Sequence, residues 1–386
     1  MTWPHDADPW VPAGPAHPLA LDVLLHGPLS RAALARRTGL SPGSVTRLTA
    51  PLVSDGVLVE VTGTGPTGVG RPSQPLDIAP DAHHFVGVKL TGDRAHGVRT
   101  TFRAEVVASA ELPLDDHDPE AVADVTAALV AELAEPTGRT GGRPATAAGV
   151  SLGARTTDAG HVVRAPFLGW EDVPFGDLVR ARTAVPTVLA NDVEALLALT
   201  HWFGEGRGVP TFALVTVGAG IGYGLVANGR PVRAADAGLG LLAHHPLDPH
   251  GPVCPAGHRG CATAMLTTGS ITAQVGVALR RPVDLPEVLA LAAAGEPAAV
   301  RVVDDAARAL GRLVAAAANF SLSGLVVVGG EGSGLATAAP AALAEGLHAD
   351  RDPLAADPVL AVQSPDLGQW ARGAAVEAVR RFVLGA

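Results

Sequence analysis

The sequence has little cysteine, few aromatic residues and almost no lysine. Two cysteines cannot form a disulfide framework, so we expect a protein of a reducing compartment, by default the cytoplasm. Aromatic residues make up 4% of the chain, so the hydrophobic cores must be built mainly from alanine, valine and leucine. No apolar run reaches about 18 residues and no charged-then-apolar leader is present, so we expect neither a membrane span nor a signal peptide.

Positive charge is concentrated in one short region. The whole chain, 386 residues and long enough for two or three domains, has a formal net charge of −10, which by itself argues against nucleic acid as a partner. Between residues 26 and 76, however, five arginines (31, 36, 37, 47 and 71) face only Asp55 and Glu60, a balance of +3. A small basic unit on an acidic body is typical of a DNA-binding module attached to another domain.

Residues 17–80 have the pattern of a winged helix-turn-helix. Three short helices are expected, the first ending at Gly27. The second begins after the N-cap Ser30 and ends in a left-handed turn at Gly39, and the third begins after the N-cap Ser41. Strands at 57–61 and 73–78 around a glycine-rich tip would form the wing. Residues 1–16 contain four prolines and no helical period, which predicts a flexible arm.

The third helix is the candidate DNA-reading element. At about 100° per residue, Val45, Leu48 and Leu52 share a buried face, which leaves Arg47 pointing outward. We also expect Leu40 to fill space between the helices, and Pro51 to bend or end the third helix. An outward arginine can bind guanine in the major groove, and an arginine at the wing tip can enter the minor groove. The alternatives are a helical bundle with a solvated arginine, and a wing that touches only phosphate. The candidate DNA-binding residues are Ser41, Ser44, Thr46, Arg47 and Arg71.

From residue 84 onward, strands and helices alternate, which predicts an α/β class. The expected order is three β runs (85–90, 96–101 and 105–112), a helix at 119–135, a strand at 147–152, a helix at 174–183, a strand at 185–190 and a helix from 192. A similar order begins again after residue 211, with a strand at 325–328 and a last helix at 369–383.

Two further motifs follow each other closely after residue 211. The apolar run at 212–217 predicts a buried strand. Gly218, Gly220, Gly222 and Gly224 come directly after it, and this spacing allows close approach of the backbone to a ligand or another strand. Six potential metal ligands come next along the chain: His244, His245, His250, Cys254, His258 and Cys261.

This order of motifs resembles the ROK family of repressors, unassigned open reading frames and sugar kinases. Residues 218–222 match its phosphate-loop signature, 238–244 its run ending in a histidine, and 254–261 its zinc loop. The resemblance implies a two-lobed actin-like ATPase fold for residues 81–386, with a ligand cleft between the lobes. Lobe one would comprise about 81–203 plus the C-terminal helix at 369–386, and lobe two about 204–368.

The kinase motif of the family is altered in this chain. Family kinases have an Asp-x-Gly-Gly-Thr-Lys turn, and the aligned residues run from Lys89 to Arg94. Lys89, the only lysine, cannot ligate magnesium; the Cβ of Thr91 obstructs a phosphate; Asp93 would repel it. We therefore expect no ATP binding and no kinase activity.

The resemblance implies a partly retained sugar site. Asn191, Asp192 and His244 match family residues that contact sugar, and Asp192 matches the base of the kinases. Leu241 and Thr263 replace two sugar-binding glutamates, and Phe167 replaces an asparagine, so a less polar or differently shaped ligand is expected. The alternative for the pair at 191–192 is a helix N-cap.

The zinc loop has lost one of its ligands. The family binds zinc with one histidine and three cysteines, and Ala256 replaces the middle cysteine. The remaining matches are His244, Cys254 and Cys261; His258 is the candidate fourth ligand, with His245 and His250 as alternatives. A metal-free loop with two thiols is the other interpretation.

Together these features predict a regulator that binds a double-stranded DNA operator as a homodimer or homotetramer, because one winged helix reads only a few base pairs. The resemblance implies a sugar or related metabolite as effector. Two alternatives remain open, namely a sugar kinase with an added DNA-binding module and a regulator that needs no ligand.

Overall fold

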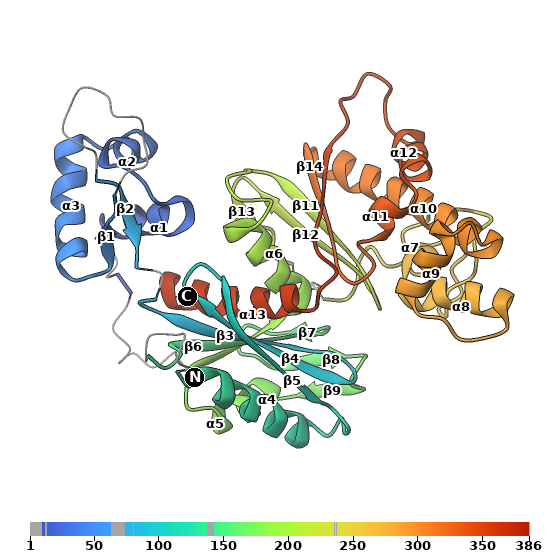
Figure 1. The fold of residues 1–386 in the computed structure, drawn as a ribbon, viewed down its shortest axis with the longest axis horizontal. Coiled ribbons are helices and arrows are strands. Elements are labelled where there is room, and N and C mark those ends of the chain that lie inside the picture. The colour runs from blue at the N-terminus through green and yellow to red at the C-terminus, as the bar shows by residue number, and fades with distance from the viewer. Residues whose placement is uncertain are drawn as a thin grey trace.

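The computed structural model describes residues 10, 11, 14–62, 74–79, 81–136, 143–234, 236 and 238–385. A winged helix lies to one side of a larger α/β body that has two lobes (Figure 1). Among the described residues, no helix has both the length and the apolar character needed to span a membrane.

The winged helix contains the three predicted helices and a two-stranded wing. Ser30 and Ser41 cap α2 and α3 as expected, accepting hydrogen bonds from the backbone nitrogens of Ala33 (3.1 Å) and Ser44 (3.2 Å). Gly39 has a φ of 70°, the left-handed turn predicted between them. The elements are α1 (His17–His26), α2 (Arg31–Thr38), α3 (Pro42–Ser54), β1 (Leu58–Glu60) and β2 (Leu76–Ile78).

Three details of this unit differ from the prediction. Leu40 is 36% exposed and does not fill the space between the helices, because it follows the left-handed turn just before α3 begins. Thr49 is fully buried, and its hydroxyl donates to the carbonyl of Val45 (2.9 Å); Leu48 is only half-buried. The helix α3 continues past Pro51 to Ser54, so the proline does not end it.

Part of the predicted flexible arm is packed against the body. Trp10 and Val11 are 7% and 4% exposed. The Trp10 ring lies edge-on to Phe102, with centroids 5.2 Å apart, and also contacts His17. Burial of this aromatic surface explains why the two residues are held in place; residues 1–9 and 12–13 lie outside the described part of the chain.

The first lobe contains a five-stranded sheet in the order β10-β6-β3-β4-β5. The strands β3, β4 and β5 are antiparallel neighbours, whereas β6 and β10 are parallel additions on the other side of β3. Their bounds are β3 (His84–Leu90), β4 (Arg94–Thr101), β5 (Val106–Pro113), β6 (Ala147–Leu152) and β10 (Thr187–Asn191).

The second lobe repeats this arrangement. Its sheet has the order β13-β12-β11-β14-β15, again with an antiparallel meander on one side of the first strand and two parallel strands on the other. The predicted duplicated α/β body is therefore present. The bounds are β11 (Phe212–Val217), β12 (Ile221–Ala227), β13 (Arg230–Pro231), β14 (Leu325–Gly329) and β15 (Val359–Val362).

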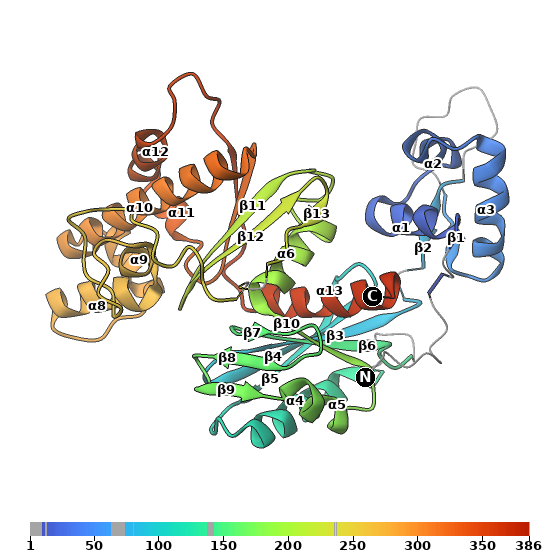
Figure 2. The same cartoon turned by 180° about the vertical axis from the view of Figure 1, so that it is seen from behind.

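Two helices connect the parts of the body. The last helix, α13 (Gly368–Leu384), packs on the first sheet, where an added Cβ at Gly87 would lie 1.9 Å from the carbonyl oxygen of Ala371. The helix α6 (Asp192–Phe203) packs on α13 and on β12 of the second lobe, where Leu197 covers Gly224. Figure 2 shows α6 and α13 between the two sheets from behind.

The remaining elements surround the two sheets. The helices α4 (Pro119–Ala134) and α5 (Phe175–Arg182) cover the outer face of the first lobe (Figure 1). The expected helices of the second half of the chain are present, and the small sheet of β7, β8 and β9 was not predicted. Their bounds are β7 (Arg155–Thr156), β8 (Val162–Ala165), β9 (Trp170–Val173), α7 (Ala262–Leu266), α8 (Thr268–Leu279), α9 (Leu285–Ala293), α10 (Pro297–Ser321), α11 (Leu335–Ala338) and α12 (Pro340–Ala349).

Candidate DNA interface and interlobe site

The start of α3 presents polar side chains to solvent. Ser41, Thr46 and Arg47 are exposed, and Ser44 is half-buried. The Ser41 and Ser44 hydroxyls lie 2.9 Å apart, and the Thr46 hydroxyl donates to the carbonyl of Pro42 (3.0 Å). Four of the five predicted DNA-binding residues therefore lie on one short stretch; Arg71 lies outside the described residues.

The arginines of the winged helix fall into two groups. Arg31 pairs with Glu60, and Arg37 pairs with Asp22, each at 2.7 Å, so these charges are neutralised within the unit. Arg36 and Arg47 are exposed and have no ion pair or hydrogen bond with any described residue. A free guanidinium can form paired hydrogen bonds to a carboxylate, a phosphate or a guanine edge.

A buried ion pair occupies the space between the lobes. Lys89, at the end of β3, donates to the carboxylate of Asp192 at the start of α6. Their side chains are 8% and 14% exposed. The Lys89 ammonium also lies 5.0 Å from the centre of the Trp370 ring, a cation–π contact with α13. The carboxylate of Asp192 is therefore held by a positive charge.

Asn191 is a helix cap in this structure. Its side-chain oxygen accepts from the backbone nitrogens of Val193 (2.9 Å) and Glu194 (3.1 Å), and its nitrogen donates to the carbonyl of Ala154 (2.9 Å). The side chain is 3% exposed. Hence the N-cap is Asn191 rather than Asp192, and most of its hydrogen-bonding capacity is used within the protein.

Phe167 extends into the same interlobe space. Its ring is 51% exposed. Its ring atoms lie 3.1 Å from where a Cβ at Gly153 would be and 3.8 Å from one at Gly220, which belong to the first and second lobes. A carboxylate oxygen of Asp192 lies 3.4 Å from the same Gly153 position. An aromatic face and a carboxylate thus border one space.

The glycine loop of the second lobe has an acidic neighbour. A carboxylate oxygen of Glu331 lies 2.4 Å from where a Cβ at Gly218 would be, so this side chain rests directly on the loop. A carboxylate at this place would repel a phosphate group.

The histidine and cysteine cluster forms a compact group. One atom, His244 Nδ1, lies 3.7 Å from the Sγ atoms of both Cys254 and Cys261. The nitrogen of His258 lies 3.6 Å from Cys254 Sγ. Tetrahedral zinc, with bonds of about 2.0 Å to nitrogen and 2.3 Å to sulfur, separates such ligand atoms by about 3.6 Å. The same separations also suit S–H···N hydrogen bonds.

The two thiols differ in acidity. Burial opposes ionisation of Cys254, but hydrogen bonds from the side chain and backbone of His258 and from the backbone of Ala256 together lower its pKa to about 7. Burial raises the pKa of Cys261. A thiol that ionises near neutral pH suits metal binding.

The predicted ligand-binding residues therefore separate into two places. Asn191 and Asp192 lie together at the start of α6, whereas His244 contacts the two cysteines and has no hydrogen bond to Asp192 within the described structure. A hollow of about 1100 Å³ between β10, β13 and α13 includes neither Asp192 nor His244. The contacts of Lys89, Trp370 and Glu331 were not predicted, although the sequence had already singled out Lys89 as the only lysine and as the residue aligned with the acid of the kinase turn.

Comparison with known proteins gives one consistent result. The N-acetylglucosamine repressor of Escherichia coli O6:H1 is 25% identical over 315 residues, which cover 79% of this chain and 77% of the relative. The crystal structure of a ROK family transcriptional regulator, a homolog of the E. coli MLC protein, has a TM-score of 0.78 at 21% identity and covers 96% of both chains. A ROK hexokinase from Thermus thermophilus has a TM-score of 0.60 at 29% identity, covering 76% of this chain and 97% of that one.

The likeness to the hexokinase covers 76% of the chain, whereas the likeness to the regulator covers 96% of it and therefore includes the winged helix. Residues 86–346, well over half of the chain, match the ROK family directly. This chain belongs to the ROK family.

Proposed function

We propose that this protein is a transcriptional repressor that binds operator DNA and responds to a sugar or sugar derivative. The observation that carries the proposal is Arg47, exposed and without a described partner on α3 of a winged helix. In a helix-turn-helix protein the second helix of the motif enters the major groove, where an arginine reads guanine. The relative named as an N-acetylglucosamine repressor supports both the operator and the sugar.

Assembly follows from the size of one DNA-reading unit. A single winged helix contacts few base pairs, so useful specificity requires two half-sites and therefore a homodimer or homotetramer. An operator-binding protein works where the chromosome lies, so the proposal includes a cytoplasmic location.

The proposal excludes phosphoryl transfer. Transfer from ATP needs a magnesium site, a phosphate cradle and a base that is free to accept a proton. In this chain Lys89 replaces the acid and binds the aligned base Asp192, and Glu331 rests on the glycine loop. A coupled ATP assay across hexoses tests the alternative of a sugar kinase, and turnover above a no-enzyme control would support that alternative.

The ligand is proposed to bind beside Phe167 and Asp192. The half-exposed ring offers a flat apolar face for the C–H face of a sugar ring or for an apolar substituent, and the carboxylate accepts hydroxyl groups. Leu241, in place of a carboxylate, is 66% exposed. We expect a ligand with fewer hydroxyl groups than a free hexose, or one with an apolar substituent.

Zinc remains part of the proposal. His244, Cys254 and Cys261 have donor types and mutual separations that suit zinc. His258, whose Nδ1 lies 3.6 Å from Cys254 Sγ, is proposed as the fourth ligand, and the metal would hold the loop in one shape. Of His245, His250 and His258, only His258 is in contact with a cysteine of the cluster within the described residues, through Cys254 Sγ.

Two experiments test the proposal. Selection of bound sequences from a random duplex library, followed by anisotropy titration, should yield a symmetric site; enrichment of no sequence would contradict operator recognition. A thermal-shift screen with sugars, sugar phosphates and aryl glycosides should find a ligand that raises Tm, and Phe167→Asn should change which compounds do so. If operator binding occurs and no compound shifts Tm or operator affinity, the regulator that needs no ligand is favoured.

A further inference from the structure

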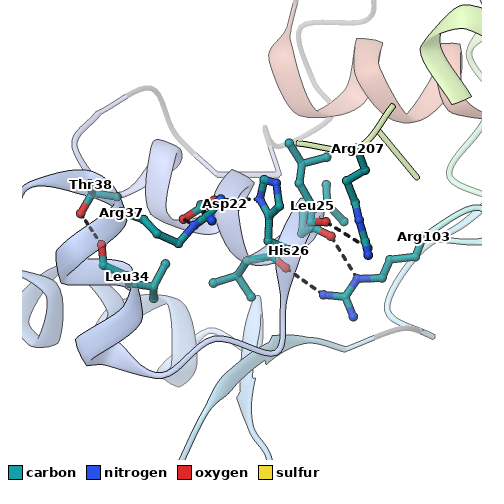
Figure 3. Close-up of polar contacts among 10 residues, drawn as sticks. Asp22, Leu25, His26, Leu34, Arg37, Thr38, Arg103 and Arg207 are labelled. Atoms are coloured by element: carbon teal, nitrogen blue, oxygen red, sulfur yellow. Dashed lines mark hydrogen bonds and ion pairs between the residues drawn. The ribbon is translucent and has the colours of Figure 1, made fainter. Parts of the chain in front are cut away.

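The C-terminus of α1 is held by an arginine from the body. Arg103, in the turn between β4 and β5, donates from Nε to the carbonyl of Leu24 (3.0 Å) and from Nη2 to the carbonyl of Val23 (2.8 Å). Nη2 also lies 2.5 Å from a carboxylate oxygen of Asp77 on the wing strand β2. One guanidinium therefore joins the first helix, the wing and the body. Figure 3 shows its contacts with the end of α1.

The Arg103 contact has room because residue 27 is a glycine without a side chain. A Cβ at Gly27 would lie 2.5 Å from the Val23 carbonyl oxygen, 2.8 Å from Arg103 Nη2 and 2.9 Å from Asp77 Oδ1. A larger residue at position 27 would therefore clash with the carbonyl at the end of α1 and with the guanidinium. The last carbonyls of a helix also carry partial negative charge and need donors, which favours a cation at this end.

A second arginine reaches the same helix end. Arg207 Nη1 lies 3.5 Å from the carbonyl oxygen of Leu25 (Figure 3). Arg207 belongs to the loop between α6 and β11, and Glu205 in this loop accepts a hydrogen bond from Gln363 (2.8 Å), which follows β15 of the second lobe. The loop is therefore attached to the second lobe.

The helix before this loop begins at the proposed ligand site. Asp192, paired with Lys89, is the first residue of α6, and Arg207 follows its last turn. Twelve residues of α-helix span about 18 Å. A rigid helix thus connects the space beside Phe167 with the base of the winged helix.

We propose that Arg103 is the positioning residue that fixes the winged helix on the body, and that Arg207 carries displacement of α6 to the same end of α1. This inference rests on the proposed function. Displacement of α6 by a ligand would shift Arg207 relative to Arg103, and since both hold α1, the orientation of α3 would change.

The test compares four variants of the full chain. Arg103→Ala removes the guanidinium, Arg103→Lys keeps its charge, and Gly27→Ala fills the space without changing any charge. Arg37→Ala is the matched control, because it removes an arginine–aspartate pair that lies wholly within the winged helix. Circular dichroism checks folding, and Gly27→Ala and Arg103→Lys keep the test decisive if Arg103→Ala does not fold.

The first measurement is the distance between α2 and α4. Ala32 in α2 and Ala128 in α4, both exposed, are each replaced by a ketone-bearing amino acid that carries the spin label. Neither cysteine is then used for labelling. We expect one narrow distance distribution for the wild type and for Arg37→Ala, and a broad one for Arg103→Ala and Gly27→Ala, with Arg103→Lys between them. Distributions for Arg103→Ala and Gly27→Ala that match the wild type, or equal broadening in Arg37→Ala, would overturn the inference.

The second measurement uses DNA with one or two half-sites. Arg103→Ala should weaken binding to the two-half-site operator by about tenfold, while binding to a single half-site changes by less than about twofold. Equal weakening on both DNAs would show that Arg103 does not act through orientation. If no protein, wild type included, binds any selected DNA, the proposed function fails, and the distance measurement still decides the positioning role.

Discussion

At the scale of single residues, Lys89 and Asp192 form a buried ion pair in which each side chain depends on the other. Two buried charges of opposite sign compensate each other's loss of water, so each depends on its partner. The resemblance to the kinases implies that a lysine at this place removes a magnesium ligand, and in this structure the same lysine holds the aligned Asp192. The same side chain links three elements, because it also contacts Trp370 on α13.

Removing one charge of this pair should therefore lower the stability of the folded protein. We expect Lys89→Met to lower the free energy of unfolding by about 3 kcal/mol, because Asp192 is left buried and unpaired. The double variant Lys89→Met/Asp192→Leu should recover most of this loss. Arg301→Met, which breaks an exposed pair with Asp305, is the control and should change stability by less than about 1 kcal/mol. Urea unfolding measures all three, and equal effects of the Lys89 and Arg301 variants would contradict the structural role of the pair.

His83 makes stability depend on pH. Burial, assisted by Arg143 and His84, lowers its pKa from 6.5 to about 4. The unfolded state therefore takes up a proton as pH falls below about 6.5, whereas the folded state does so only near pH 4. Between these values, acid favours unfolding.

Lowering the pH from 7 to 5 should reduce the free energy of unfolding by about 2 kcal/mol through this one histidine. His83→Gln should reduce the difference between unfolding free energies measured at the two pH values. It should not abolish the difference, because burial also lowers the pKa of His84 and of His201. The same pH dependence in wild type and variant would show that His83 is not protected from protonation in the folded protein.

At the scale of elements, close helix–sheet packing decides which residues are tolerated. The helix α13 approaches β3 so closely that Gly87 has no room for a Cβ. We expect Gly87→Ala to destabilise the protein by about 3 kcal/mol or more. Gly269→Ala in α8, where nothing lies within 4 Å of the added methyl, should stabilise it by up to about 1 kcal/mol. Thermal unfolding distinguishes the two, and a neutral Gly87→Ala would contradict the packing.

The loop with the histidine and cysteine cluster gives a further prediction. Purified protein should contain one zinc ion per chain by mass spectrometry of metals, and a strong chelator should lower Tm because the loop loses its cross-link. Cys254→Ser should lose the zinc, whereas His250→Ala, which changes an exposed histidine outside the cluster, should keep it. Wild-type protein without zinc after growth in zinc-supplemented medium would contradict the metal site.

The elements also show how far local sequence patterns determine structure. The strands expected at 147–152 and 212–217 have the same bounds in the structure, because continuous apolar runs buried in a sheet leave a strong local signal. The strands β7, β8 and β9 have two to four residues and exist through their pairing, so no local pattern predicts them. Caps at Ser30 and Ser41 were predictable because the side chain bonds within its own turn.

At the scale of the whole molecule, the ion pair at the start of α6 and the arginine contacts at the end of α1 join distant parts of the chain. Lys89 and Asp192 are 103 positions apart, and Arg103 and Val23 are 80 positions apart. Spacing along the sequence carries no information about such pairs. The sequence therefore predicts which units exist, namely a winged helix and a duplicated α/β body, but not the ion pair between the lobes or the arginines that hold α1.

The winged helix is proposed to recognise specific DNA through α3. Arg36 and Arg47 are both exposed arginines of the winged helix without a described partner, but only Arg47 lies on α3. They therefore form a matched pair, in which Arg47 is expected to read a base and Arg36 at most to contact phosphate.

The decisive measurement is the ratio of affinities for the selected operator and for unrelated DNA at fixed salt, obtained by anisotropy titration. Arg47→Ala should lower this ratio by roughly 10- to 100-fold, because a bidentate contact to guanine contributes about 1–3 kcal/mol of discrimination. Arg36→Ala should weaken both affinities alike and leave the ratio unchanged. An unchanged ratio in Arg47→Ala, with the fold intact by circular dichroism, would contradict recognition of DNA through α3.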